Sequence, residues 1–413
     1  MRVLLIVSLM TLGVGCGKAV AESACGPSTC VSGCCDTEGR CAVSSAGGSC
    51  GTGGLQCAVC SASQECKANV CSTIAPVDSG VGADAGMALD AGTMPSQPIV
   101  APAEAWTWVD FPDSRCGNGE PTGIGINPTT RSTDLFIYMQ GGGACWEGLT
   151  CFVVKSAANF ETGYTGVTFT STGAKNLPAF NRAVANNPFK DASFVFVPYC
   201  TGDVHAGDAE QFFSNRTVSF KGAKNMQAYL KRLTLTFPSV TRVFLTGSSA
   251  GAFGAQLNYP RVREAFPQAE VHVLADSGQM LSPKGTLLTD WVAAWNVTVP
   301  DTCVGCLADF TKYPAWLATT YPSSRFALLA YSEDNVLRQF FQYTVAEFNT
   351  RTDALLTEKY DPRANARYYY LLGSDHTMMG AQFIVTSPPP ASVKLNDFIT
   401  QWYTGSASWV NVK

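Results

Sequence analysis

Short apolar segments alternate with helical stretches from about residue 101 to the end of the chain, and this alternation constrains the fold most strongly. The segments are continuous runs of apolar residues, as expected for strands buried on both faces of a parallel sheet. They cover residues 134–139, 193–198, 242–245, 270–274, 326–331 and 367–372. Helical periodicity appears at residues 225–237, 252–266 and 336–349. The pattern predicts an α/β fold with a doubly wound, mostly parallel sheet.

Small and polar residues follow each predicted strand. They lie at residues 141–143, 199–203, 247–251, 276–278, 332–335 and 373–376. In an open parallel sheet the carboxyl ends of the strands line one crevice, where ligands bind. We therefore expect these segments to form a single site.

The turn GSSAG at residues 247–251 has the pattern of a nucleophile elbow. Its glycines permit a tight strand-to-helix turn, which holds the oxygen of Ser249 above the sheet at a helix N-terminus. The pattern alone is common in loops rich in glycine and serine. An apolar strand before it and helical periodicity after it favour Ser249 as a catalytic nucleophile.

The candidate base follows from the scarcity of histidine, because the chain has only 3. In strand–elbow–helix hydrolases the acid and the histidine follow the serine along the chain. His205 precedes Ser249, and His272 lies inside a predicted strand, where a core role is expected. His376 follows the last strand in a loop, so we predict that it is the general base. We expect His205 to order its loop or to touch substrate.

The acid that orients the histidine is predicted to be Asp334, with Glu333 as the closest alternative. Both residues follow a strand and precede a helical stretch, where the acid of such a triad usually lies. Asp276 and Asp375 are further alternatives, and the carboxylates that are not used would cap helices or bond to loops.

An oxyanion hole is expected from two places. One donor is the backbone N–H of Ala250, which follows the nucleophile. The other is expected from Gly142 or Gly143, because their missing side chains allow the backbone to approach a tetrahedral oxygen. Trp146 and Phe152 lie near this glycine loop and are candidates for an acyl pocket or for the core.

Four segments occur in an order that resembles the pectin acetylesterase family, which includes the animal Notum carboxylesterases. They are MQGGGACW (139–146), PYCTGDV (198–204), GSSAG (247–251) and ADSG (275–278). The resemblance covers residues 104–400 and implies an α/β-hydrolase fold with a Ser-Asp-His triad. Ser249 and His376 match the family pattern. The position of the acid differs by one residue between the possible alignments, and His205 stands where the family has a tryptophan. The resemblance also implies removal of acetyl groups from pectin or, in the animal branch, of a fatty acyl group from a protein.

The sequence predicts four regions. Residues 1–21 read as an export signal, ending either after Ala21 or, as a lipoprotein signal, before a lipidated Cys16. Residues 22–71 form a cysteine-rich module, residues 72–100 a flexible linker with a repeated Asp-Ala-Gly or Asp-Ser-Gly motif, and residues 101–413 the catalytic domain.

Of 17 cysteines, 10 lie between residues 25 and 71 and 6 between residues 116 and 306. Both groups are even, which predicts disulfides and an oxidising compartment. Cys57 and Cys60 have a zinc-like spacing, but export and the absence of histidine from the module favour disulfides. We expect a secreted protein or an outer-surface lipoprotein of a bacterium.

These observations lead to an exported serine esterase that removes acetyl groups from a pectin-like polysaccharide without cofactor or metal. A carboxylesterase for longer acyl esters is the alternative. A surface-binding protein with a non-catalytic hydrolase scaffold is the alternative of another class. A net charge of −4 without clustered cations argues against nucleic acid as a partner. The expected partners are an acylated carbohydrate and, through Cys16, a membrane, and the chain is expected to be monomeric.

Overall fold

The computed structural model divides the chain into two compact units, Met1–Met87 and Ala88–Lys413. The structure describes residues 25–26, 30, 34–42, 50, 55–60, 64–67, 70–73, 97–380 and 393–413. The predicted export signal, Cys16 and residues 74–96 of the predicted linker lie outside the described residues. The boundaries of the four regions predicted from the sequence stay predictions. No helix in the described ranges combines the length and the hydrophobicity needed to cross a bilayer.

Disulfides dominate what is described of the N-terminal unit. It contains short antiparallel pairs, β1 (Cys34–Cys35) with β2 (Cys41–Ala42) and β3 (Gln64–Lys67) with β4 (Val70–Thr73). Four bridges join Cys25 to Cys35, Cys30 to Cys41, Cys34 to Cys57 and Cys60 to Cys71. The predicted disulfide-rich region is confirmed, and Cys57 and Cys60 belong to two different bridges.

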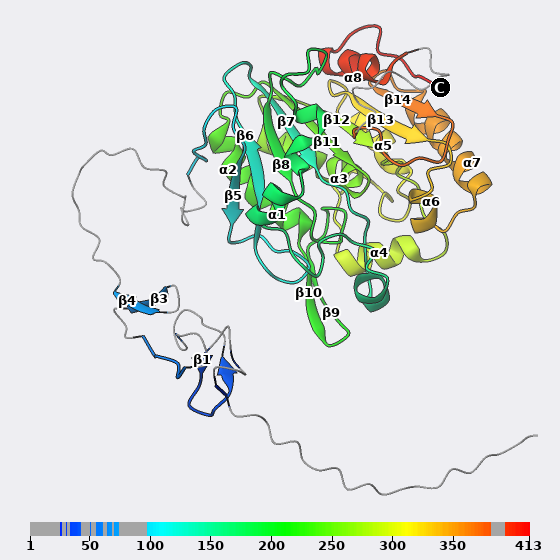
Figure 1. The fold of residues 1–413 in the computed structure, drawn as a ribbon. Coiled ribbons are helices and arrows are strands. Elements are labelled where there is room, and N and C mark those ends of the chain that lie inside the picture. Colours follow the sequence, from blue (N-terminus) through cyan, green and yellow to red (C-terminus); the bar gives the residue numbers. More distant parts are fainter. Residues whose placement is uncertain are drawn as a thin grey trace, which may run out of the picture. The chain divides into compact units, whose positions relative to one another are not determined.

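An eight-stranded sheet organises the larger unit, in the order β14-β13-β12-β11-β7-β8-β6-β5 (Figure 1). The strands are β5 (Thr107–Phe111), β6 (Thr122–Asn127), β7 (Asp134–Met139), β8 (Ser193–Val197), β11 (Arg242–Ser248), β12 (Glu270–Asp276), β13 (Phe326–Tyr331) and β14 (Ala366–Leu371). Strands β14 to β8 are parallel along this order, and β6 and β5 add an antiparallel edge. The predicted α/β fold with a mostly parallel sheet is confirmed.

Alternate residues of each strand enter two separate cores, one on each face of the sheet. In β7, Ile137 and Met139 join the core beneath α2 and α3, whereas Phe136 and Tyr138 join an aromatic core beneath α1 and α8. Because both faces are covered, both sides of β7 are lined by apolar residues.

The helices of the larger unit are α1 (Gly166–Ser171), α2 (Gly222–Thr236), α3 (Ala250–Ala265), α4 (Leu287–Trp295), α5 (Lys312–Thr320), α6 (Leu337–Phe340), α7 (Val345–Leu355) and α8 (Leu395–Thr404). Shorter helical turns are η1 (Leu149–Val153), η2 (Ala174–Asn176), η3 (Pro178–Phe180) and η4 (Leu356–Tyr360). A hairpin of β9 (Ala209–Phe213) and β10 (Arg216–Phe220) projects from the sheet layer near α4 (Figure 1).

The continuous helix predicted over residues 336–349 is wrong. The segment is divided into α6 and α7, because Gln342 adopts a left-handed φ of 58° that ends the first helix. Thr344 then caps α7 through a reciprocal capping box with Glu347. Sequence periodicity passed over this break because the apolar residues on its two sides keep a helical spacing.

Both ends of this unit are tied to its folded body. Ile99, which the sequence assigned to the linker, is buried, and its N–H donates to Thr236 Oγ1 at 2.8 Å. At the other end, Val412 pairs along the outer side of β14, donating its N–H to the carbonyl of Tyr368 and accepting one from the N–H of Tyr370. Strand β14 is therefore covered along part of its free edge.

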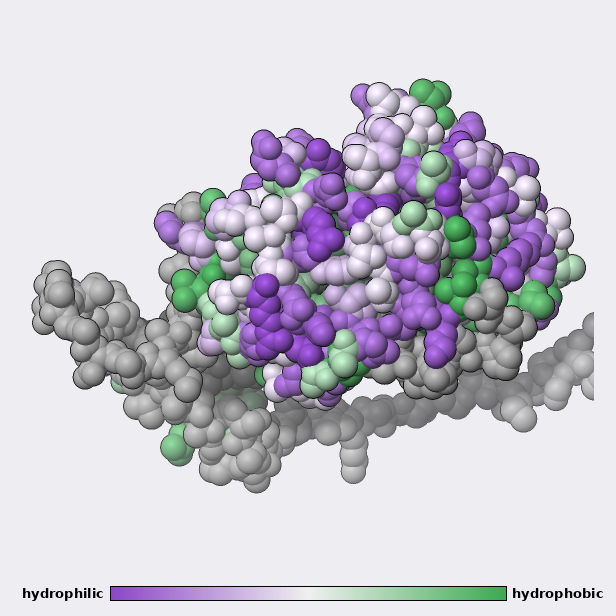
Figure 2. All heavy atoms as spheres, turned by 90° about the horizontal axis from the view of Figure 1, so that it is seen from above, coloured by the Kyte–Doolittle hydropathy of each residue, from purple (hydrophilic) through white to green (hydrophobic). Residues whose placement is uncertain are grey.

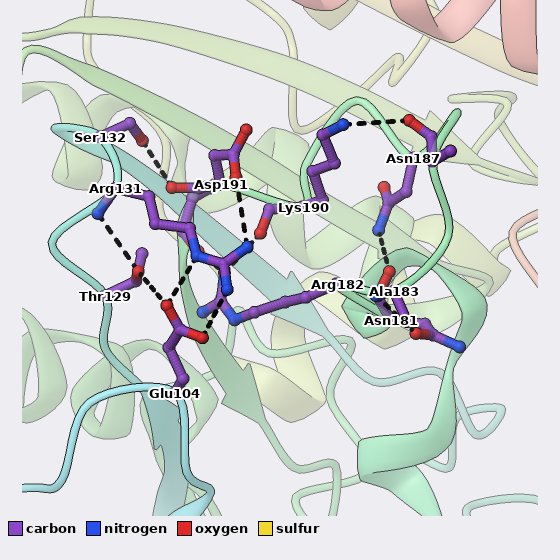
Figure 3. A network of polar contacts seen from close by, with 12 residues as sticks. Glu104, Thr129, Arg131, Ser132, Asn181, Arg182, Ala183, Asn187, Lys190 and Asp191 are labelled. Carbon is purple, nitrogen blue, oxygen red and sulfur yellow. Dashed lines mark hydrogen bonds and ion pairs between the residues drawn. The ribbon is translucent and has the colours of Figure 1, made fainter.

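A polar network closes the end of the sheet where the parallel strands begin (Figure 3). Arg182 lies over the ring of Phe194 and donates to Asn127 and to the carbonyls of Lys190 and Ala192. Figure 3 also shows the Arg131 guanidinium between the carboxylates of Glu104 and Asp191. These contacts lie at the opposite end of the strands from the predicted site.

Three disulfides brace the larger unit: Cys116–Cys200, Cys145–Cys151 and Cys303–Cys306. The disulfides expected from the even cysteine count are therefore confirmed here.

On the face drawn in Figure 2, hydrophobic residues form small groups among hydrophilic ones.

Candidate active site

Ser249 occupies a strained turn between β11 and α3. Its backbone has φ 56° and ψ −125°, a conformation that L-residues rarely adopt. The flanking glycines make the turn possible. A Cβ on Gly251 would lie 2.0 Å from the carbonyl oxygen of Met139, and a Cβ on Gly247 would lie 2.2 Å from that of Gly251. The Ser249 N–H donates to the Asp276 carbonyl at 2.8 Å, which fixes the turn to β12.

His376 and Asp334 meet at the carboxyl end of the sheet. Nδ1 of His376 lies 2.9 and 2.8 Å from the two carboxylate oxygens of Asp334. Asp334 is fully buried and also accepts the N–H groups of Val336 and Leu337, so it begins α6 as well. The structure thus places Asp334, and not Glu333, against the histidine. Asp375 is exposed.

No hydrogen bond joins the Ser249 hydroxyl to His376 within the described part of the chain. Catalytic hydrogen bonds are often long or poorly aligned without substrate. The two residues nevertheless belong to one neighbourhood, because Asp276 bonds both to Ser248 and to the segment that follows His376.

The glycine loop after β7 presents its backbone beside Ser249. Gly142 and Gly143 have φ values of 154° and 75°, and a Cβ on Gly143 would lie 2.0 Å from the Ser156 carbonyl oxygen. In the described residues, the N–H groups of these glycines donate no hydrogen bond. Ala250 is the first residue of α3, so its N–H has no acceptor within the helix. These are the donors that the sequence predicted for an oxyanion hole.

The other two histidines lie in buried structural positions. Nε2 of His205 lies 2.8 Å from the Gln140 carbonyl oxygen, next to the glycine loop, and burial lowers the pKa of His205 to about 4. Burial likewise lowers the pKa of His272 to about 3, and its Nδ1 accepts the N–H of Arg325. Both contacts agree with the roles expected for these residues, loop ordering for His205 and core packing for His272.

An apolar cavity opens beside Ser249. Its lining comes from the glycine loop, the elbow, α3, α4 and α6. The residues are Gly143, Ala144, Val204, Ser249, Ala250, Phe253, Trp291, Trp295, Phe310, Leu337, Phe340 and Phe341. Trp146 and Phe152, the aromatics singled out from the sequence, are absent from this lining. Trp146 instead packs behind it, 5.5 Å from the ring of Trp291.

Sequence reasoning missed a hydrogen-bonded chain beneath the nucleophile. The Tyr138 hydroxyl donates to Ser248 Oγ at 3.0 Å, and Ser248 Oγ donates to Asp276 Oδ2 at 2.7 Å. Burial raises the pKa of Asp276 to about 6, against the opposing effects of its hydrogen-bond donors and of His376. The sequence had placed Asp276 at the end of a buried strand and in the ADSG segment, but it did not indicate the hydrogen bond to Ser248.

Comparison with known proteins shows that residues 107–299 match the Pectinacetylesterase family. The predicted resemblance to this family is confirmed. Human palmitoleoyl-protein carboxylesterase NOTUM is 29% identical over 210 aligned positions, and the alignment covers 46% of this chain and 42% of that protein. Pectin acetylesterase 11 of Arabidopsis thaliana is 24% identical over 229 aligned positions, and the alignment covers 51% of this chain and 54% of that protein. The similarities support a carboxylic ester hydrolase.

The chain spans about half the length of these curated relatives. The matched family region contains the glycine loop and Ser249, but it ends before Asp334 and His376. Beyond residue 299, the assignment of Asp334 and His376 to the site therefore rests on their geometry in the structure.

Proposed function

We propose that this protein is an exported serine ester hydrolase that works through an acyl-enzyme on Ser249. The observation that carries the proposal is the position of Ser249, at a strained elbow where an apolar cavity meets free backbone N–H groups. The His376–Asp334 pair lies at the same end of the sheet and supplies a proton acceptor with a fixed orientation.

In the acylation step, Ser249 Oγ attacks the ester carbonyl carbon while Nε2 of His376 takes the hydroxyl proton. Asp334 holds Nδ1–H and stabilises the imidazolium. The tetrahedral oxygen accepts hydrogen bonds from Ala250 and from Gly142 or Gly143, each donor typically being worth about 3 kcal/mol. The alcohol then departs with the proton from His376.

In the deacylation step, His376 removes a proton from water as the water attacks the acyl carbon. The tetrahedral intermediate collapses, Ser249 recovers its proton from His376, and the carboxylic acid is released. Both steps use the same base and the same oxyanion donors.

The cavity favours an acyl chain longer than acetyl. Apart from Ser249 and Gly143, every residue that lines it is apolar, and an acetyl group has only one methyl group to bury there. Its aromatic and aliphatic lining stabilises methylene groups by about 0.8 kcal/mol each on burial. Phe340 lies against Gly143, so the chain would extend directly from the proposed oxyanion hole.

Removal of acetyl groups from a pectin-like polysaccharide is the second candidate, and the matching family favours it.

The disulfides of both units support export, since such bridges persist in oxidising compartments. Anchoring through a lipidated Cys16, with the cysteine-rich module as a spacer, remains part of this proposal for a bacterial surface.

The test is hydrolysis of p-nitrophenyl esters from acetyl to dodecanoyl, together with acetate release from acetylated pectin and xylan. Wild type and Ser249→Ala are compared. We expect Ser249→Ala to abolish turnover and wild type to prefer chains longer than acetyl. A maximum at acetyl with acetate release from pectin would select the second candidate. A wild type without activity on any ester would overturn the enzyme proposal and favour a binding role.

A further inference from the structure

Three consecutive backbone N–H groups that follow His376 are held by the end of β12. Thr377 N–H donates to Ser277 Oγ at 3.0 Å, and Met378 N–H donates to Asp276 Oδ1 at 2.7 Å. Met379 N–H donates to Asp276 Oδ2 at 2.9 Å. The segment over residues 373–380, here named the histidine loop, is therefore tethered immediately after its functional side chain.

The same aspartate also binds the nucleophile elbow. Its Oδ2 accepts the Ser248 hydroxyl at 2.7 Å, and its main-chain oxygen accepts the Ser249 N–H at 2.8 Å. The register of the sheet places Ser248 opposite Asp276, so this contact follows from the pairing of β11 with β12. One fully buried residue thus contacts both segments that carry the proposed chemistry.

We propose that Asp276 is a positioning residue that holds the histidine loop in register with the nucleophile elbow. The inference rests on the proposed function of Ser249 and His376. Asp276 holds the backbone of the histidine loop, whereas Asp334 orients the imidazole ring of His376. A displacement of about 1 Å between reacting groups can cost roughly 10²-fold in rate, so such a tether acts directly on turnover.

Asp276 is suited to this role only as a carboxylate. Its three side-chain contacts are all donors, and a proton on Oδ2 would compete with those from Ser248 and Met379. Because burial raises the pKa of Asp276 to about 6, the tether weakens as the pH falls through that value. Two titratable groups face it from neighbouring elements: Tyr138 of β7, through Ser248, and His376 of the histidine loop.

The experiment compares the full-length wild type with Asp276→Asn on the best p-nitrophenyl ester. We expect kcat to fall roughly 10- to 100-fold with little change in KM, because the ester-binding cavity does not include Asp276. Below about pH 6, log kcat of the wild type should fall with a steeper slope than that of the Asp276→Asn variant, because only the wild type has a carboxylate at this position that gains a proton there.

Asp134→Asn is the matched control, because Asp134 is a buried carboxylate of the same sheet that pairs with Arg242 and Tyr403 at the opposite end. It should lower the unfolding temperature and leave kcat and the slope unchanged while the protein is folded. If Asp276→Asn does not fold, Ser277→Ala and Ser248→Ala each remove one contact of the tether and should each lower kcat with KM unchanged.

The two proposals fail in different ways. An active wild type, an inactive Ser249→Ala variant and an Asp276→Asn variant with wild-type kcat and slope would overturn the role of Asp276 alone. Unchanged kcat in both Ser277→Ala and Ser248→Ala would overturn it as well. An inactive wild type would overturn the proposed function on which it rests.

Discussion

In the proposed triad, Asp334 determines whether His376 presents a usable nitrogen to Ser249, because both carboxylate oxygens of Asp334 lie within hydrogen-bonding distance of Nδ1. An asparagine there would stabilise the wrong histidine tautomer. We expect Asp334→Asn to lower kcat by roughly 10⁴-fold at neutral pH. The matched control is Glu333→Gln one residue earlier, which should stay close to wild type. Ester hydrolysis by both variants measures this, and a larger loss in the Glu333 variant would assign the acid to Glu333.

The sequence was sufficient to predict Ser249 and His376 as candidates and insufficient to choose the acid. Ser249 lies between a predicted strand and a helical stretch, and the chain has only 3 histidines, of which His376 alone follows the serine in a loop. Glu333 and Asp334 differ by one position, and the choice depends on how the loop leaves β13. There the N–H of Glu333 pairs with the Gly373 carbonyl, a contact between segments far apart in the sequence. The Asp276 tether was unpredictable for the same reason.

At the scale of elements, α6 brings Phe340 to the cavity, where the ring also lies against Gly143. Phe340→Trp narrows the space available to an acyl chain, and Phe340→Ala widens it. We expect the preferred ester to become shorter in the tryptophan variant and longer in the alanine variant. Profiles of kcat/KM against chain length test this. Identical profiles in all three proteins would mean that the acyl chain lies elsewhere.

The loops at the opposite end of the sheet depend on Arg182, whose guanidinium is partly buried and bonds to two separate segments, at Asn127 and at residues 190–192 (Figure 3). Arg182→Met leaves several buried oxygens without donors, so we expect a loss of about 2–4 kcal/mol in the free energy of unfolding. Arg131→Met removes an exposed ion pair with Glu104 and should lower the free energy of unfolding much less than Arg182→Met. Chemical denaturation compares them, and equal losses would contradict this ranking.

The edge strands β5 and β6 show why part of the fold escaped sequence analysis. Strand β6 contains Gly123 and Gly125, residues that are typical of loops. In the structure they are required by packing, because a Cβ on Gly123 would lie 2.0 Å from the Val109 carbonyl oxygen and one on Gly125 would lie 2.6 Å from the Phe169 ring. The buried parallel strands were predictable because their apolar runs depend on burial alone.

At the scale of the whole molecule, the sequence predicted that the cysteines form disulfides, but it did not predict which cysteines pair in the described residues. The even count of cysteines led to pairing, but the bridge between Cys116 and Cys200 spans 84 residues and depends on the tertiary fold. Closing so long a loop restricts the unfolded chain, an effect that theories of chain entropy put at about 4–5 kcal/mol. Disulfides of this kind persist in oxidising compartments.

The pairing of Val412 with β14 has a consequence for solubility. An uncovered edge strand offers free N–H and C=O groups to other molecules, and natural proteins protect such edges from self-association. Removal of residues 409–413 should expose β14 and produce concentration-dependent aggregation below the unfolding temperature, detectable by light scattering. Removal of Lys413 alone, whose side chain pairs with Asp353 and lies over the ring of Tyr370, should not. A longer truncation that stayed monodisperse would contradict this role of Val412. If it aggregates, residues 409–413 prevent the sheet from polymerising through its β14 edge.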